Sequence, residues 1–88
     1  MDNYKLYITI VEQGSFSKAA EKLGITQPTV SKQIDRLEDK LGCQLFKRST
    51  RKLLLTAAGE RYYERAIEID ALVMAAEHEI RHISSHES

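Results

Sequence analysis

Apolar residues recur along the chain with the three- and four-residue spacing of amphipathic helices. The first such stripe consists of Tyr4, Tyr7, Ile8 and Val11. Asp2 is a suitable cap for this helix, and Gly14 ends it, because glycine readily adopts the left-handed conformation that follows a last helical turn. A second, short helix is predicted between a cap at Ser15 or Ser17 and a left-handed turn at Gly24.

A third helix is predicted over residues 26–41, opening at Thr26 with Pro28 in its first turn, where a missing N–H costs nothing. Its predicted buried face consists of Val30, Ile34, Leu37 and Leu41. Ala20 and Val30 lie on either side of the Gly24 turn, at positions where two helices can approach closely. This arrangement predicts a helix-turn-helix.

The segment after Gly42 is predicted to form a β-hairpin. Residues 44–47 and 52–55 have the pattern of two short strands around a polar tip. The tip is basic, because Lys47-Arg48-Ser49-Thr50-Arg51-Lys52 places four cations in six residues without an acidic residue.

The last helix is predicted from a cap at Thr56 to about residue 84, a length of roughly 40 Å at about 1.5 Å per residue. Its apolar positions are spaced 4, 3, 4, 3, 4 and 3 residues apart, the heptad pattern of a helix that pairs with another helix. These positions, here called the seam, are Tyr62, Ala66, Ile69, Val73, Ala76, Ile80 and Ile83. A domain of this size cannot cover the far end of such a helix, so the seam predicts self-association.

The net charge of zero conceals two oppositely charged parts. Residues 1–56 contain ten Lys/Arg and six Asp/Glu, a net charge of +4, whereas residues 57–88 contain three and seven, a net charge of −4. A basic front and an acidic back indicate that one end faces a polyanion. The single cysteine, Cys43, excludes an internal disulfide and a zinc site built from cysteines, and it fits a reducing compartment. No apolar run approaches the ~20 residues of a membrane span, and no signal peptide is evident, so we expect a cytoplasmic protein.

The outward face of the third helix carries side chains suited to reading DNA bases. Gln27 is suited to adenine, Lys32 to guanine, and the Thr29 methyl group to thymine, while Ser31 adds a small hydroxyl. The positive end of the helix dipole also favours nearby phosphate. An ordinary solvated face explains any one of these residues, but it does not explain the basic segment that follows.

The order of these motifs resembles the N-terminal domain of LysR-type bacterial transcriptional regulators. The resemblance covers residues 4–60 and is carried by GSFSKAAEKL (14–23), TQPTVSKQIDRLE (26–38), LG (41–42), LFKR (45–48) and LTAAG (55–59). It implies a mainly α fold, a winged helix-turn-helix of three helices plus a two-stranded β-hairpin wing in residues 1–56, followed by a dimerisation linker helix in residues 57–88. It also implies binding of double-stranded DNA at interrupted inverted repeats near promoters, as a homodimer joined through the linker helix.

The resemblance assigns base contacts to Gln27, Pro28, Ser31 and Lys32, and the outward face adds Thr29. The expected contacts with the DNA backbone, including the wing, come from Ser17, Lys18, Arg36, Arg48, Ser49, Thr50, Arg51 and Lys52. This chain departs from the family pattern at two positions. Lys32 replaces an arginine, which turns a forked contact into a point charge. Asp35 places a carboxylate where many members are basic or neutral, and such a group either repels phosphate or accepts from a cytosine amine.

We expect no enzymatic activity and no cofactor, because the sequence contains no Ser-His-Asp set, paired-carboxylate cleft or glycine-rich phosphate loop. A small-molecule inducer is expected to act only through a C-terminal effector-binding region, which these residues cannot form.

Two other functions compete with DNA binding. One is an interaction module in which the seam is the working part, although the division of charge argues against it. The other is a self-contained winged-helix sensor, in which a metal or oxidation at Cys43 or at the i, i+4 histidines His78, His82 and His86 controls the release of DNA. A solvated polar strip explains those histidines better. Tyr62 and Tyr63 could stack on single-stranded nucleic acid, but their place beside acidic residues favours packing in the domain or the seam.

Overall fold

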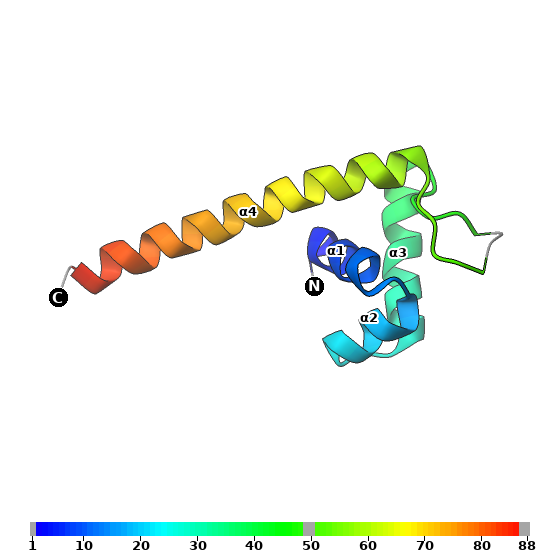
Figure 1. Cartoon of the computed structure of the whole chain (residues 1–88), viewed down its shortest axis with the longest axis horizontal. Coiled ribbons are helices and arrows are strands. Elements are labelled where there is room, and N and C mark those ends of the chain that lie inside the picture. Colours follow the sequence, from blue (N-terminus) through cyan, green and yellow to red (C-terminus); the bar gives the residue numbers. More distant parts are fainter. Residues whose placement is uncertain (1, 49–50, 87–88) are drawn as a thin grey trace.

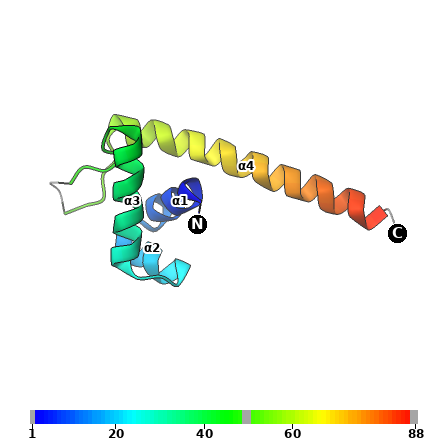
Figure 2. The same ribbon diagram turned by 180° about the vertical axis from the view of Figure 1, so that it is seen from behind.

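Four helices make up most of the protein, whose computed structural model describes residues 2–48 and 51–86. They are α1 (Asn3–Gln13), α2 (Phe16–Leu23), α3 (Gln27–Leu41) and α4 (Ala57–His86). Helices α1, α2 and α3 pack together beneath the first part of α4, and the rest of α4 extends well past them (Figure 1). The same projection is evident from behind (Figure 2), and the molecule measures 56 × 26 × 20 Å.

The helix ends follow the local signals of the sequence. Glycines in the left-handed conformation end three helices, with φ of 74°, 69° and 73° at Gly14, Gly24 and Gly42. The Ser15 hydroxyl caps α2 by accepting the N–H of Lys18 at 2.9 Å. Thr26 caps α3 in the same manner, whereas Asp2 precedes α1 without a side-chain cap bond. The helix boundaries were therefore predictable from capping residues.

The core lies where α1 meets the other three helices and the segment after α3. Its buried side chains are Leu6, Tyr7, Ile10, Ala19, Ala20, Val30, Ile34, Leu37, Leu45 and Phe46. The Tyr7 ring packs against Phe46 and Tyr62, with centroids 5.2 and 4.9 Å away, and its hydroxyl donates to the Gly59 carbonyl at 2.8 Å. Burial raises the pKa of Tyr7, as do the nearby charge of Glu38 and, to a smaller degree, Tyr62. Tyr7 thus joins α1 to the start of α4 as a neutral hydrogen-bond donor.

Position 59, in the first turn of α4, requires glycine because neighbouring groups leave no room for a Cβ atom. A Cβ atom at this position would lie 2.0 Å from the Leu45 carbonyl oxygen and 2.8 Å from the Tyr7 hydroxyl. Thr56 caps the same turn, because its hydroxyl accepts the Gly59 N–H at 3.0 Å and donates to the Gln44 carbonyl at 2.7 Å. These contacts hold α4 against the segment that connects it to α3.

The predicted two-stranded hairpin is reduced to a single β-bridge within residues 2–48 and 51–86. Phe46 and Leu55 form an isolated antiparallel bridge. It is flanked by hydrogen bonds from Lys47 N–H to the Leu54 carbonyl (2.9 Å) and from Thr56 N–H to the Leu45 carbonyl (3.0 Å). The pairing goes no further toward α3, because the Leu45 N–H donates to the Glu38 side chain instead of crossing to the opposite segment. The strands predicted over residues 44–47 and 52–55 are therefore not confirmed, because the described residues form only this one bridge.

One prediction of a buried position was wrong. Leu41 was expected on the buried face of α3 but is 44% exposed, because it lies at the end of α3 on the edge of an open hollow that Ala58 and Tyr62 of α4 also line. Cys43, which follows the helix-ending Gly42, is also exposed.

The second half of α4 has no cover from the rest of the chain. Its exposed apolar side chains include Leu72, Met74, Ile80 and Ile83, which are 71%, 61%, 63% and 47% exposed. Across the described part of the chain, no helix is both long and apolar enough to cross a membrane.

Candidate nucleic-acid interface

The helix-turn-helix places the N-terminal half of α3 at the surface. Ala20 and Val30 are buried where α2 meets α3, and Gly24 makes the turn between the two helices. The buried face of α3 leaves its opposite face in solvent. This packing therefore holds the candidate base-contact residues on a rigid helix.

Most of the predicted base-contact residues are exposed. Gln27, Pro28, Thr29 and Lys32 lie in solvent on α3, and Ser31 is half-buried. The Thr29 hydroxyl is already engaged, since it shares a hydrogen bond of 2.8 Å with the Thr26 hydroxyl. Gln27 and Lys32 therefore have the side-chain ends most available to a base edge.

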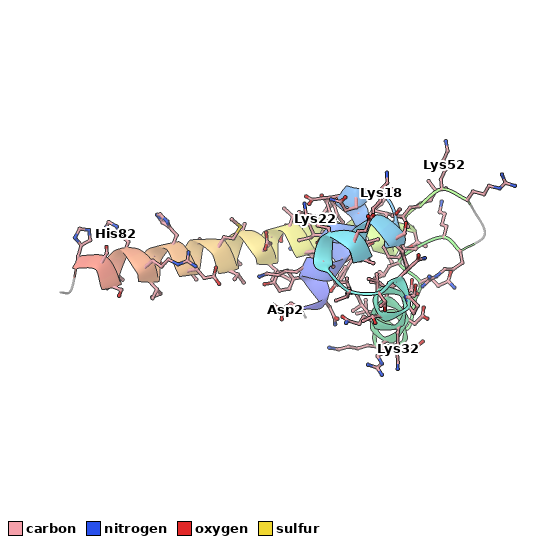
Figure 3. All side chains as sticks on the ribbon, turned by 90° about the horizontal axis from the view of Figure 1, so that it is seen from below. Asp2, Lys18, Lys22, Lys32, Lys52 and His82 are labelled. Carbon is pink, nitrogen blue, oxygen red and sulfur yellow. The ribbon has the colours of Figure 1, made fainter. Side chains whose placement is uncertain are left out.

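The predicted backbone-contact residues come from three elements. Ser17 and Lys18 are exposed in the first turn of α2, where the Ser17 hydroxyl bonds to that of Ser15 at 3.1 Å. Arg36 is exposed on α3. Lys18, Lys32 and Lys52 all lie at the end of the molecule remote from His82 (Figure 3). In that view Lys18 and Lys52 extend to one side and Lys32 extends to the other.

Residues 47–52 are here called the basic loop, and the described residues on its two sides (47–48 and 51–52) extend beyond the helices at this end (Figure 1). Arg51 and Lys52 are exposed, whereas Ser49 and Thr50 lie outside the described residues. A hollow of about 250 Å³ separates the loop from the turn between α1 and α2. Its lining includes Gly14, Ser15, Phe16, Lys47, Arg51 and Lys52. Cations therefore border a concave surface next to the first turn of α2.

The protein itself binds the guanidinium of Arg48. Its Nη2 atom donates to Asp35 Oδ1 at 3.1 Å and also to Glu38 Oε1. The guanidinium carbon lies 5.9 Å from the centre of the Phe16 ring. The expected backbone contact from Arg48 thus competes with two carboxylates of α3.

Glu38 is a residue that the sequence-based site did not include. Its residue exposure is 8%, and its Oε2 accepts the N–H groups of Leu45 and Phe46 at 2.6 and 3.3 Å. One signal was available, since Glu38 follows Ile34 by four residues and so lies on the apolar face of α3. A carboxylate on a buried face needs partners, and the chain supplies them from the segment after α3.

The seam of α4 divides into a covered and an uncovered part. Ala66 is completely buried, and Tyr62 packs on Tyr7. Val73 is half-buried, whereas Ile69, Ala76, Ile80 and Ile83 are exposed. Ala66 thus serves the fold of the single chain, and the uncovered part starts at Ile69.

The residues considered for metal or redox sensing are dispersed. His78, His82 and His86 are exposed on α4, and the rings of His82 and His86 are 4.5 Å apart. Within the described ranges, no group of three or more His, Cys, Asp or Glu side chains is arranged to hold a metal ion. Cys43 lies far from these histidines along the chain, at the end of α3.

Residues 1–60 match the family model described as bacterial regulatory helix-turn-helix protein, lysR family. The chain belongs to the LysR family. It is 44% identical over 80 residues to the HTH-type transcriptional regulator BudR of Klebsiella aerogenes, a match that covers 91% of this chain and 56% of BudR. The chain thus spans about half the length of this LysR-family relative.

Two solved structures of LysR-family DNA-binding domains on DNA are similar to this fold. The BenM DNA-binding domain in complex with catB site 1 DNA matches with a TM-score of 0.93 and 36% identity, and the match covers 100% of both chains. The CbnR DNA-binding domain in complex with DNA matches with a TM-score of 0.83 and 34% identity, over 92% of this chain and 93% of that one. The named relatives are transcriptional regulators, in agreement with the expectation that the chain is not an enzyme.

Proposed function

We propose that this chain is the part of a LysR-family regulator that binds double-stranded DNA, with sequence preference, at promoter inverted repeats. The observation that carries the proposal is the match of the whole chain, at a TM-score of 0.93, to a domain solved on DNA. In this proposal α3 is the recognition helix and enters the major groove. The basic loop serves as the wing and contacts the flanking backbone or the minor groove.

Base contacts are assigned to Gln27, Pro28, Thr29, Ser31 and Lys32. Gln27 and Lys32 carry most of the sequence preference, because both are exposed and their end groups match the edges of adenine and guanine. The Thr29 hydroxyl bonds to Thr26, which leaves the Thr29 methyl group for an apolar contact. Each lost bidentate contact costs about 1–3 kcal/mol of discrimination.

Backbone contacts are assigned to Ser17, Lys18, Arg36, Ser49, Thr50, Arg51 and Lys52, of which Ser49 and Thr50 are assigned from the sequence alone. Ser17 and Lys18 approach phosphate at the start of α2, where backbone N–H groups and the helix dipole favour an anion. These contacts set affinity and its salt dependence but not the choice of sequence.

We further propose that the protein binds as a homodimer joined through α4. The support is the uncovered part of the seam, where Ile69, Ile80 and Ile83 expose 41%, 63% and 47% of their surface. A heptad-spaced apolar stripe on a projecting helix is the usual surface for helix pairing. The two recognition helices then lie about 34–36 Å apart, or a multiple of that distance, on one side of the duplex. Residues 1–56 act as the DNA-binding unit and residues 57–88 as the dimer arm.

The deciding experiment is a fluorescence-anisotropy titration of the chain at two salt concentrations. The probes are a pool of duplexes with an interrupted inverted repeat and a matched scrambled pool. We expect tighter binding to the repeat, and this preference persists at the higher salt concentration. Equal, steeply salt-dependent binding to both pools means that the chain holds phosphate only. No binding to either pool refutes the proposed function and leaves the interaction module.

A matched pair of lysines tests the recognition helix. Lys32→Ala removes a cation from the exposed face of α3, while Lys22→Ala removes one from the last turn of α2. We expect Lys32→Ala to reduce the ratio of repeat to scrambled affinity by roughly tenfold, and Lys22→Ala to leave that ratio unchanged. Equal ratios in the two variants contradict the assignment of Lys32 to a base.

A further inference from the structure

We propose that Arg48 is a positioning residue that fixes the basic loop beside the recognition helix by binding Asp35 and Glu38. This inference rests on the proposed DNA-binding function, and it gives Arg48 a role other than phosphate contact. It also gives Asp35 a role on a face where a carboxylate otherwise opposes DNA binding.

The first argument is the local balance of charge. One guanidinium meets two carboxylates, at 3.1 Å from Asp35 and in closer contact with Glu38. The net charge of this group of three is −1, so it does not attract a phosphate in the way that a lone arginine does. Within the described residues Arg51 has no ion pair, and it is exposed. Of the two arginines of the loop, Arg51 is therefore the one suited to contact phosphate, while Arg48 is paired within the protein.

The second argument is the burial of Glu38, whose side chain is 9% exposed. A buried carboxylate is costly without a full set of partners. One Glu38 oxygen accepts the Leu45 and Phe46 N–H groups, and the other binds Arg48. Removal of Arg48 leaves the Glu38 carboxylate buried without its cation. The ion pair therefore stabilises the fold, and exchanging it for a contact with DNA phosphate is unfavourable.

The third argument is the placement of these partners along the chain. Asp35 and Glu38 lie on α3, and Arg48, in the basic loop, follows them by thirteen and ten residues respectively. Phe16, under the guanidinium, comes from the first turn of α2. The contacts of Arg48 thus connect the loop to both helices of the helix-turn-helix. The Lys47 N–H, hydrogen-bonded to Leu54 at 2.9 Å, closes the base of the loop next to this group.

The test compares Asp35→Asn with Asp39→Asn in the full chain. Both substitutions remove one exposed carboxylate from α3, one turn apart, and within the described residues Asp39 has no ion pair. Asp39→Asn therefore measures the effect of charge alone, which is a small gain in DNA affinity. We expect the affinity of Asp35→Asn for the inverted-repeat pool to be about two- to fivefold lower than that of Asp39→Asn. An equal gain in both variants overturns the proposal, because Asp35 is then only a repelling charge.

The same comparison in an Arg48→Ala background isolates the pair. In this background, the difference in DNA affinity between Asp35→Asn and Asp39→Asn should be smaller than the difference between the two single variants. An undiminished difference shows that Asp35 acts without Arg48 and overturns the proposal.

The salt dependence of DNA binding tests for phosphate contact. Loss of one phosphate contact reduces the magnitude of the slope of log K against log salt by about 0.9. Arg51→Ala should show this change and Arg48→Ala should show less of it. An equal change in both variants overturns the proposal.

Hydrogen exchange in the free protein separates this inference from the proposed function. The reporter is the Lys47 amide, whose bond to Leu54 closes the loop. We expect this amide to exchange about two- to fivefold faster in Asp35→Asn than in Asp39→Asn, because the loop opens more easily without the pair. Equal exchange rates overturn the positioning role even if DNA binding is intact. Faster exchange in a protein that binds no DNA supports the positioning of the loop, while the proposed function fails.

Discussion

The two halves of α4 have the same apolar repeat but differ in what covers it. In the first half Ala66 is completely buried and Tyr62 packs on the Tyr7 ring of α1. In the second half Ile80 and Ile83, at equivalent spacing, are 63% and 47% exposed. The change occurs where α4 passes beyond α1 and extends away from the other helices (Figures 1 and 2).

This difference shows that a heptad repeat predicts an apolar face, but not the partner that covers it. The seam was predicted as one dimer surface, yet its first part serves the core of the single chain. The same repeat could have both roles, because a second copy of α4 in the proposed dimer would present an apolar stripe similar to that of α1. Substitutions in the two halves should therefore have separable effects, on folding in the first half and on association in the second.

The largest effect is expected for Gly59→Ala, in the covered half. The new Cβ atom meets the Leu45 carbonyl oxygen at 2.0 Å and the Tyr7 hydroxyl at 2.8 Å, so α4 must move away from the core. We expect a loss of about 3 kcal/mol in the free energy of unfolding, measured by urea denaturation. Gly42→Ala is the control, because its Cβ has no neighbour within 4 Å and only its φ of +73° opposes the substitution. A smaller loss for Gly59→Ala than for Gly42→Ala contradicts the close packing at Gly59.

Ile80→Gln, in the uncovered half, should weaken association without weakening the fold. A dimer buries two copies of this side chain, so the loss of about 1 kcal/mol per copy raises the dimer Kd roughly thirtyfold. Sedimentation equilibrium measures the Kd. Met74→Gln is matched in exposure, at 61% against 63%, but lies on the opposite side of α4 from the seam. An equal loss in both variants contradicts the seam as the interface.

Tyr7→Phe tests the hydrogen bond that joins α1 to the covered half of α4. Loss of the bond to the Gly59 carbonyl should cost about 1 kcal/mol at pH 8. The raised pKa of Tyr7 adds a dependence on pH, because the unfolded chain ionises this tyrosine near pH 10 while the folded chain keeps it neutral. Stability from this source is complete below pH 10 and is lost as the pH rises further. Urea denaturation at pH 8 and pH 10.5 should show a larger fall in the free energy of unfolding for the wild type than for Tyr7→Phe. An equal fall in both proteins contradicts this role of Tyr7.

Local chemistry made the helices predictable. The left-handed glycines at positions 14, 24 and 42 and the hydroxyl caps at Ser15 and Thr26 act within a few residues, so the sequence contains the whole signal. The strands were less predictable. Their length depends on which partner each N–H group finds, and the Leu45 N–H finds Glu38, seven residues earlier on another element.

The candidate site divides in the same way. The helical period of α3 correctly placed Gln27 and Lys32 in solvent, because a helix face follows from spacing alone. The pairing of Arg48 was not predictable from spacing, since Asp35 and Glu38 reach it only after the chain turns back at Gly42. Count and sign of charge along the sequence identified the basic loop. They could not show which of its cations the fold already binds.

The smallest effect is expected for Leu72→Gln, which determines how the uncovered half of α4 faces its partner. Leu72 is 71% exposed and lies beside the seam, whose centre follows Val73 and Ile80. A second heptad stripe through Ile69, Leu72, Ala76 and Ile83 shares three positions with the seam, so exposure alone does not choose between them. If the seam is the interface, Leu72 lies at its edge, and Leu72→Gln should raise the dimer Kd by less than about threefold in sedimentation equilibrium. A rise in the dimer Kd as large as that of Ile80→Gln means that the interface includes Leu72 and is centred on Ile69, Ala76 and Ile83.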